Sequence, residues 1–392
     1  DPIGSRGLGD VYKRQGMIAP TKIAREASEI GGKGAEKYLD ELLIFREHAH
    51  HHCHKLVEPQ SWSNLPEWAK ISWSERVFTS TEKSPYLLEF GETGDTLWDS
   101  SQIGLFRHGV MHNNVRMTWG KAFANWIKDP EDAMKTSLNF NNRYALDGRD
   151  PSSIAGVMWC FGLFDRSFSP YNPVMGNVRN RTTEIHQNRI DLERYSNWTE
   201  KSTLDKKLNI GIVGGGISGS FAAMLLDNLG HNVTIFDKGR GASGRLSSKK
   251  VTSDSSIHVG SKSFDSLPKW MERYVSEWTR LKLVRMDGNS LVPIKPLSEI
   301  IKHLNKEVGV NYGCKVTSLE EKNESVEITV KNQDSINKYQ YDRVIVALPI
   351  EQAIDICNPL GLEINGVSDS TWVAWGPSCL LYTSDAADEV VS

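Results

Sequence analysis

Long apolar runs are missing from this chain: nowhere do apolar residues continue for the roughly 20 positions that a membrane-spanning helix needs. Cysteine is scarce too, because only five are present, none of them in a CxxC pair: Cys53, Cys160, Cys314, Cys357 and Cys379. This spacing argues against a disulfide framework and a zinc ribbon and favours a reducing compartment. We therefore expect a cytoplasmic protein without a membrane partner.

A strong net charge is also absent. The formal net charge of −3 gives no global attraction to nucleic acid, so any DNA binding must come from a local basic face. No internal repeat is visible, and 392 residues are too many for one typical domain, so two domains are expected. The end segments 1–15 and 378–392 lack apolar periodicity and resemble translated adapter sequence. We expect both to be artefactual or disordered and exclude them from the fold.

Between these ends the pattern changes once. Residues 16–195 space apolar side chains three and four apart, which predicts a mostly helical domain, and Asp129-Pro130 is a plausible helix start. Residues 196–207 are polar and unpatterned and are interpreted as a linker. From residue 208 to 377, LNIGIVGGG, SGSFAAMLLDNLG and HNVTIFDKG predict strand, helix and strand, and SVEITV and YDRVIVALP predict further strands of an α/β sheet. The fold class is thus multidomain, all-α followed by Rossmann-type α/β.

Tryptophan is concentrated in the helical region. Trp98, Trp119 and Trp126 lie in helical segments, where core packing is the usual role of the residue. However, the strings TLWDSSQ, HGVMHNNVRMTWGK, LNFNNRYALDGRDP, GVMWCFGLFDR and NPVMGNVR together resemble the FAD-binding catalytic domain of DNA photolyases and cryptochromes, most closely the class II photolyases. The resemblance covers most of residues 16–195. It also places GMIAPTKIAREA, around Met17, in the middle of such a domain, so we expect a chain truncated at both ends.

The resemblance implies roles for particular residues. The three tryptophans match an electron-transfer chain that reduces a photoexcited flavin. Arg116 and Asp147 match an ion pair beside the isoalloxazine ring, and Asn141 matches the residue facing flavin N5. Two further positions match the lining of the FAD pocket: Gln102 and Asn113. The resemblance leaves the roles of the neighbouring Arg149 and Asp150 open, and a solvated loop is an alternative for both.

Substrate positions are matched in part. Photolyases flip a pyrimidine dimer out of DNA into a pocket over the flavin, because stacked bases cannot be reached. The resemblance assigns Glu47 to a hydrogen bond with the dimer, Met117 and Trp159 to the pocket wall, and Asp165 and Arg179 to the opened duplex. A local basic face is expected from the arginines of this stretch, with a solvated surface as the alternative: Arg166, Arg179, Arg181, Arg189 and Arg194.

After Glu47 the chain departs from the family, because a cluster follows where aromatic or small residues are usual: His48, His50, His51, His52, Cys53 and His54. Imidazoles one helical turn apart share a face and could bind a metal, but no HExxH motif accompanies them, so we predict no metal site. The cluster keeps a second interpretation open, in which the first domain is a cryptochrome-like light sensor or a non-repair flavoprotein.

The second domain carries a dinucleotide motif. Gly214, Gly216 and Gly219 follow a predicted strand and open a helix, and Asp237 ends the next strand, where an acid would bind a ribose hydroxyl. The string FDKGRGASGR, with Arg240 and Arg245, resembles renalase-like FAD oxidoreductases. This resemblance implies FAD or NAD(P) and a reduced nicotinamide or amine substrate. The family's C-terminal part is missing after Gly376, so a nucleotide-binding fold without activity is the alternative.

We therefore predict light-driven repair of cyclobutane pyrimidine dimers in damaged DNA by an FAD in the first domain, joined to an oxidoreductase module with its own FAD.

Overall fold

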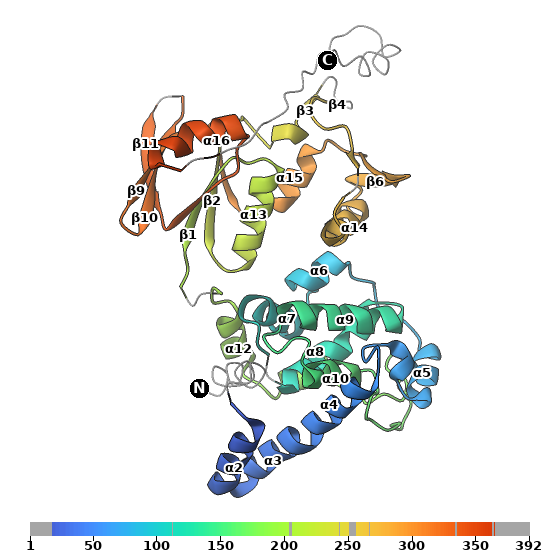
Figure 1. Ribbon diagram of the computed structural model, residues 1–392. Helices are drawn as coiled ribbons and strands as arrows, with labels where there is room; N and C mark the ends of the chain where they lie inside the picture. Colours follow the sequence, from blue (N-terminus) through green and yellow to red (C-terminus); the bar gives the residue numbers. More distant parts are fainter. Residues whose placement is uncertain are drawn as a thin grey trace. The chain divides into compact units, whose positions relative to one another are not determined.

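The computed structural model describes residues 18–111, 113–203, 206–242, 244–250, 256–265, 267–333, 335–362 and 364 (Figure 1). The chain divides into two compact units. The first ends at Lys207 and also includes Asn228–Gly230; the second comprises Leu208–Asp227 and the part from His231 onward. The segments 1–15 and 378–392, for which we expected artefact or disorder, lie outside the described residues. Within the described part, no helix combines the length and apolar composition that crossing a bilayer requires.

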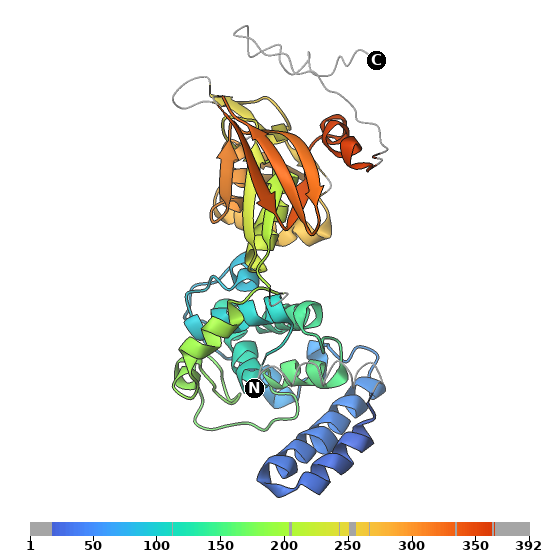
Figure 2. The same cartoon turned by 90° about the vertical axis from the view of Figure 1, so that its left-hand side faces the viewer.

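The first unit is helical in its described residues, as predicted. Its elements are α2 (Pro20–Ile30), α3 (Gly32–Asp40), the π-helical turn η1 (Glu41–Phe45), α4 (Arg46–Lys55), η2 (Trp62–Asn64), α5 (Glu67–Ser74), α6 (Pro85–Phe90), α7 (Thr96–His108), α8 (Asn113–Trp126), α9 (Pro130–Tyr144), α10 (Pro151–Trp159), α11 (Thr183–Gln187) and α12 (Leu192–Thr199). Helix α2 packs against α3, and α3, η1 and α4 follow one another without a break, as the long blue rod in Figures 1 and 2 shows.

Aspartate side chains begin three of the central helices. Asp95, Asp129 and Asp150 accept hydrogen bonds from the free backbone N–H groups at the starts of α7, α9 and α10. Proline follows two of these caps at the first helical position, where its missing N–H costs nothing. The predicted start at Asp129-Pro130 is confirmed, and Asp150 has a structural role as the cap of α10.

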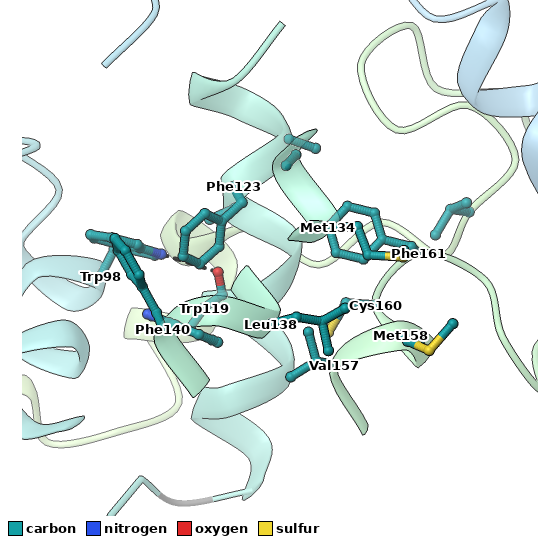
Figure 3. Close-up of a cluster of buried hydrophobic side chains, with 14 of the residues drawn as sticks. Trp98, Trp119, Phe123, Met134, Leu138, Phe140, Val157, Met158, Cys160 and Phe161 are labelled. Atoms are coloured by element: carbon teal, nitrogen blue, oxygen red, sulfur yellow. Dashed lines mark hydrogen bonds between the residues drawn. The ribbon is translucent and has the colours of Figure 1, made fainter. Parts of the chain in front are cut away.

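The core of the first unit is aromatic and surrounds α8. Trp98, Trp119, Phe123 and Phe161 are all fully buried in it (Figure 3). The C-terminal end of α8 is held by Arg76, whose guanidinium donates to the backbone oxygens of Ala124, Ile127 and Lys128. A cation at this end complements the helix dipole and satisfies carbonyls that have no partner within the helix.

The linker predicted from residue 196 begins later in the structure, because α12 continues to Thr199. The Trp198 ring lies 4.9 Å from the His108 ring, and Thr199 is fully buried. A Cβ on Gly104 would meet the Thr199 side chain at 2.8 Å, so the two helices α7 and α12 approach closely. The polar composition of SNWTEK gave no sign that Trp198 and Thr199 pack against α7.

The second unit contains a parallel sheet in the order β12-β1-β2-β8, with β1 (Asn209–Val213), β2 (Asn232–Asp237), β8 (Gly309–Tyr312) and β12 (Arg343–Val346). Helix α13 (Ile217–Asn228) connects β1 to β2, which confirms the predicted strand, helix and strand. Ile210, Ile212, Ala223 and Ile235 pack together between helix and sheet. Strands buried on both faces are typical of Rossmann-type sheets.

SVEITV is a strand, as predicted, but it does not join the parallel sheet. It forms β10 (Ser325–Lys331), the middle strand of an antiparallel sheet with β9 (Lys315–Lys322) and β11 (Ile336–Tyr341). Val316 and Ile328 of this sheet pack against Val213 and Phe236 of β1 and β2. The remaining elements are η3 (Gly244–Leu246), β3 (Ser248–Lys250), β4 (Ser256–His258), β5 (Phe264–Asp265), η4 (Lys269–Met271), α14 (Glu272–Arg280), β6 (Val284–Asp287), β7 (Ser290–Pro293), α15 (Ser298–Leu304), α16 (Ile350–Cys357) and η5 (Asn358–Leu360).

Candidate functional site

A two-point ion pair joins α8 to the loop after α9. The Nη1 and Nη2 atoms of Arg116 lie 2.8 and 3.1 Å from the Oδ2 and Oδ1 atoms of Asp147. The two side chains are only 15% and 21% exposed, so water screens their attraction weakly. A planar fork facing a carboxylate is the strongest geometry such a pair has. The structure therefore brings together two residues that the sequence placed 31 positions apart.

Asn141 lies in the same cluster. It is buried, its Nδ2 atom lies 2.9 Å from Ser153 Oγ, and that hydroxyl oxygen also accepts from Arg116 Nη1 at 3.2 Å. Ser153 thus links the predicted asparagine to the predicted arginine, and the sequence analysis missed it. The one signal in the sequence was the helix start at Asp150, which places Ser153 in the first turn of α10, where it is buried.

The three tryptophans are close together, and one of them is less buried than the other two. Trp119 and Trp98 are fully buried, whereas Trp126 is partly exposed. The ring centroids of Trp98 and Trp126 are 4.9 Å apart. The Phe123 ring lies 5.4 Å from Trp98 and 4.9 Å from Trp119, and Figure 3 shows these three rings together. The Trp98 Nε1 atom donates to the Trp119 backbone oxygen at 3.0 Å. One aromatic series therefore connects the interior of the unit to its surface.

The two predicted pocket-lining residues differ in what the structure shows. Gln102 is fully buried, and its Oε1 atom accepts from the indole Nε1 of Trp119 at 2.9 Å. It therefore contacts the tryptophan series directly. Asn113 is the first residue of α8, and its side chain lies outside the part that the structure describes.

The predicted lesion pocket is assembled only in part. Trp159 ends α10, and its ring lies 5.2 Å from Phe45, two residues before Glu47. Glu47 itself is 60% exposed and pairs with its neighbour Arg46. Met117 packs against the core, with its Sδ atom 3.9 Å from Cys160 Sγ. The ring contact to α10 is thus made by Phe45, the last residue of η1, while the Glu47 carboxylate stays at the surface.

The histidine spacing serves packing. His48 and His52 share one face of α4, and both rings lie near Phe164, at 6.0 and 5.6 Å. The His52 Nε2 atom lies 3.0 Å from the backbone oxygen of Pro59. In the residues that the structure describes, no three His, Cys, Asp or Glu side chains are grouped as metal ligands would be.

Asp165 and Arg179 lie together in an open depression whose other lining residues are Phe164, Arg166 and Phe168. The guanidinium carbons of Arg166 and Arg179 lie 5.5 and 5.7 Å from the centroid of the Phe168 ring. An aromatic ring with two guanidinium groups close to it combines side chains that suit both a base and a phosphate.

Further cations stand close to this depression. Burial first, and then repulsion by Arg179 and Arg189, lowers the pKa of Arg181. Lys121 on α8 is almost completely buried, and its desolvation lowers the pKa of its ammonium group. Repulsion by Arg179 acts in the same direction, whereas attraction by Asp165 opposes it. Most of the expected arginine face is thus a real cluster of positive charge.

In the second unit the glycine motif forms a tight turn between β1 and α13. Gly214 has a positive φ of 104°, and a Cβ on Gly219 would come within 2.0 Å of the Gly214 backbone oxygen. Only glycine fits these two positions. Gly216 differs, because a Cβ there would meet nothing within 4 Å. The open space beside Gly216 at the start of α13 has the form expected of a pyrophosphate cradle, so these residues fit a dinucleotide.

The acid of the motif is already engaged. The Oδ2 atom of Asp237 accepts from the N–H of Gly215 at 2.6 Å, and Oδ1 accepts from the N–H of Gly239 at the same distance. These bonds hold the end of β2 against the glycine turn, which is where an acid meets a ribose in such folds. Arg240 and Arg245 are exposed, and a Cβ on Gly244 would lie 3.1 Å from Gly216 Cα. The second glycine string therefore reaches the first.

Comparison with known proteins agrees with this division. Residues 212–278 match the family model described as NAD(P)-binding Rossmann-like domain, and residues 272–357 match the model described as Flavin containing amine oxidoreductase. The latter match supports FAD as a cofactor of the chain.

Curated relatives cover the N-terminal half, and each is called deoxyribodipyrimidine photo-lyase. The protein of Oryza sativa subsp. japonica is 31% identical over 209 residues, that of Methanothermobacter thermautotrophicus 37% over 170, and that of Arabidopsis thaliana 33% over 187. These matches cover 51%, 43% and 46% of this chain. The chain spans only 41%, 38% and 38% of the length of these relatives. The chain thus joins a photolyase-like helical region to a Rossmann-type region with the features of flavin-containing amine oxidoreductases.

Proposed function

We propose that the first unit binds FAD and repairs cyclobutane pyrimidine dimers in DNA with light, and that the second unit is an oxidoreductase module with its own dinucleotide. The observation that carries the first half is on α8. Arg116, of the predicted flavin-side ion pair, and Trp119, a buried tryptophan of the predicted electron-transfer chain, lie three residues apart on this helix and hence on neighbouring positions of one face.

The light-driven electron chemistry would come from bound FAD, which takes an electron from the chain when oxidised and gives one to the lesion when reduced. The residues present fit this cofactor, since Arg116 and Asp147 offer a fixed charge pair and Asn141 a buried amide. Trp119, Trp98 and Trp126 would carry electrons inward from the surface. The 4.9 Å between the Trp98 and Trp126 rings, and the partial exposure of Trp126 beside two buried tryptophans, suit stepwise transfer.

DNA would bind over the depression between Asp165 and Arg179. The surrounding arginines supply the phosphate contacts that a chain of net charge −3 cannot provide globally. Phe168, which is partly exposed, would contact an unstacked base, and the two guanidinium groups near it would contact the phosphates.

A light-sensing or other non-repair role is the second candidate for this unit. It is favoured by Glu47, whose carboxylate is exposed and paired with Arg46 where repair would need it in the lesion pocket. Histidines also stand on the face of α4 next to it.

Binding to irradiated and plain DNA separates the two roles. For repair, the purified full chain should prefer DNA carrying thymine dimers and remove them under blue light. Arg179→Ala should weaken binding to both DNAs and reduce the slope of log affinity against log salt by about 1. Arg25→Ala, at an exposed arginine of α2 outside the predicted basic face, is the matched control. Equal affinity for both DNAs, with intact flavin photochemistry, would exclude repair and favour the light-sensing role.

For the second unit we propose FAD bound at the Gly214–Gly219 turn, with NAD(P) as the alternative dinucleotide, and a reduced nicotinamide or an amine as substrate. Support comes from the open space beside Gly216 and from Asp237 at the end of β2. Release of the bound cofactor and its identification by mass, with stoichiometry per chain, tests this assignment. Two FAD molecules per chain are expected. If the unchanged protein holds only one FAD, and a Gly216 variant loses it, then the first unit binds no flavin.

A further inference from the structure

A chain of buried hydrogen bonds runs through the tryptophan series. Gln102 donates from Nε2 to the backbone oxygen of Glu89 at 3.0 Å and accepts at Oε1 from Trp119 Nε1 at 2.9 Å. Trp98 in turn donates from Nε1 to the backbone oxygen of Trp119 at 3.0 Å. The side chains of Gln102, Trp119 and Trp98 are at most 1% exposed, so bulk water does not reach these hydrogen bonds.

The orientation of the Gln102 amide is fixed by its neighbours. An indole N–H can only donate, and a backbone carbonyl can only accept. The amide oxygen must therefore face Trp119 and the amide nitrogen must face Glu89. A flipped amide would leave two buried groups facing like partners, which is costly because neither group could then form a hydrogen bond.

These acceptors matter when a tryptophan is oxidised. An indole that has lost one electron is a far stronger acid than the neutral ring, and it loses its Nε1 proton wherever a base is within reach. The acceptors at Trp119 and Trp98 are amide oxygens, which are not bases near neutral pH. Trp126 is partly exposed, so water can take its proton.

We propose that Gln102 is a positioning residue that keeps Trp119 protonated while it is oxidised, so that the positive charge moves outward and the proton is lost only at Trp126. The proposal rests on the electron-transfer role given above to the three tryptophans. Trp119 gives one electron to the photoexcited flavin, Trp98 gives one to Trp119, and Trp126 gives one to Trp98. Trp126 then loses its Nε1 proton to water, and an external thiol returns one electron and one proton to it.

Gln102→Glu is the direct test, because it keeps the shape of the side chain and, once ionised, places a base beside the Trp119 N–H. Transient absorption after a blue flash distinguishes the tryptophan radical cation from the neutral radical. At alkaline pH, where the introduced carboxylate is ionised, a neutral Trp119 radical should form early and the long-lived Trp126 radical should be lost. Gln187→Glu, which adds the same charge at the end of α11, should behave like the unchanged protein.

Two results would overturn the proposal. One is a Trp126 radical of unchanged yield and lifetime in ionised Gln102→Glu. The other is an early neutral Trp119 radical in the unchanged protein. If the unchanged protein forms no tryptophan radical at all under light, the electron-transfer role itself fails, and that outcome is distinct from both.

Hydrogen exchange of the Trp119 indole N–H gives a readout that does not depend on photochemistry. The resonance is assigned by its loss in Trp119→Phe. Exchange should be slow in the unchanged protein and faster in Gln102→Met, a variant of similar length without the acceptor. Equal exchange in both, at equal unfolding free energy, would show that Gln102 does not hold the indole.

Discussion

The indole rings of Trp98 and Trp126 lie 4.9 Å apart at an interplanar angle of 75°. One ring is fully buried and the other reaches the surface, so the pair spans the outer edge of the core. Their edge-to-face packing is favourable in itself, which means that the same contact serves both stability and electron transfer.

Replacing Trp126 by Phe should therefore separate these two uses. Phenylalanine keeps most of the packing but is much harder to oxidise, so light-driven flavin reduction in the presence of a thiol should become far slower while the flavin content stays the same. Steady blue illumination with absorption spectra measures the rate. Trp73→Phe, at a buried tryptophan outside the series, is the control. An unchanged rate in Trp126→Phe would contradict the proposed exit at Trp126.

The Arg116–Asp147 pair should be worth more than a surface ion pair. Asp147→Ala leaves a guanidinium that is 15% exposed without its main partner, and we expect the unfolding free energy of the first unit to fall by about 2 kcal/mol. Denaturant unfolding measures this loss. Glu131→Ala, which breaks the exposed Lys135–Glu131 pair on α9, should change stability much less. Equal losses of unfolding free energy in the two variants would mean that the buried pair contributes no more to stability than the exposed one.

Two glycines of the same turn should respond differently to a side chain. Gly219→Val drives a Cβ into the Gly214 carbonyl and should destabilise the second unit. Gly216→Val places its side chain in open space, so the unit should stay folded while dinucleotide binding is lost. Calorimetric unfolding and cofactor titration of both variants check this contrast. If a folded Gly216→Val protein still binds the dinucleotide, the pyrophosphate does not lie beside Gly216.

Lys121 should make the stability of the first unit depend on pH. Burial lowers the pKa of its ammonium group, so the unfolded chain holds this proton to higher pH than the folded one. Stability should therefore rise as pH increases from the lowered pKa toward about 10.4, the unfolded value. Lys121→Met should raise the unfolding free energy at neutral pH by about 1 kcal/mol. The difference in unfolding free energy between Lys121→Met and the unchanged protein should shrink toward alkaline pH. A difference that grows instead would contradict a lowered pKa of Lys121.

Sequence patterns were most informative where a local rule decides the structure. Asp129-Pro130 begins a helix because the aspartate cap and the proline both act within one turn. The strand, glycine turn and helix from Asn209 to Asn228 follow equally from local chemistry. The pairing of β10 could not be foreseen this way, since alternating apolar residues suit a parallel or an antiparallel neighbour alike.

The site shows the same limit. Arg116, Asp147 and Asn141 were found by motif resemblance, but Ser153, which joins them, carries no motif of its own. Gln102 was assigned to the pocket lining, whereas its hydrogen bond to Trp119 depends on the crossing of α7 and α8. Glu47 was expected in a pocket and lies exposed beside Arg46, because the ring contact to Trp159 is made by Phe45.

Arg76 has an electrostatic effect beyond closing α8. Its guanidinium bonds to the backbone of Ala124, Ile127 and Lys128, on both sides of Trp126. A permanent positive charge so near disfavours a second one, so an oxidised Trp126 would be driven to release its proton and become neutral. Once neutral, it takes an electron back from the interior only slowly, because refilling it then requires a proton as well. The residue that caps the helix would thus also make the last step of charge separation hard to reverse.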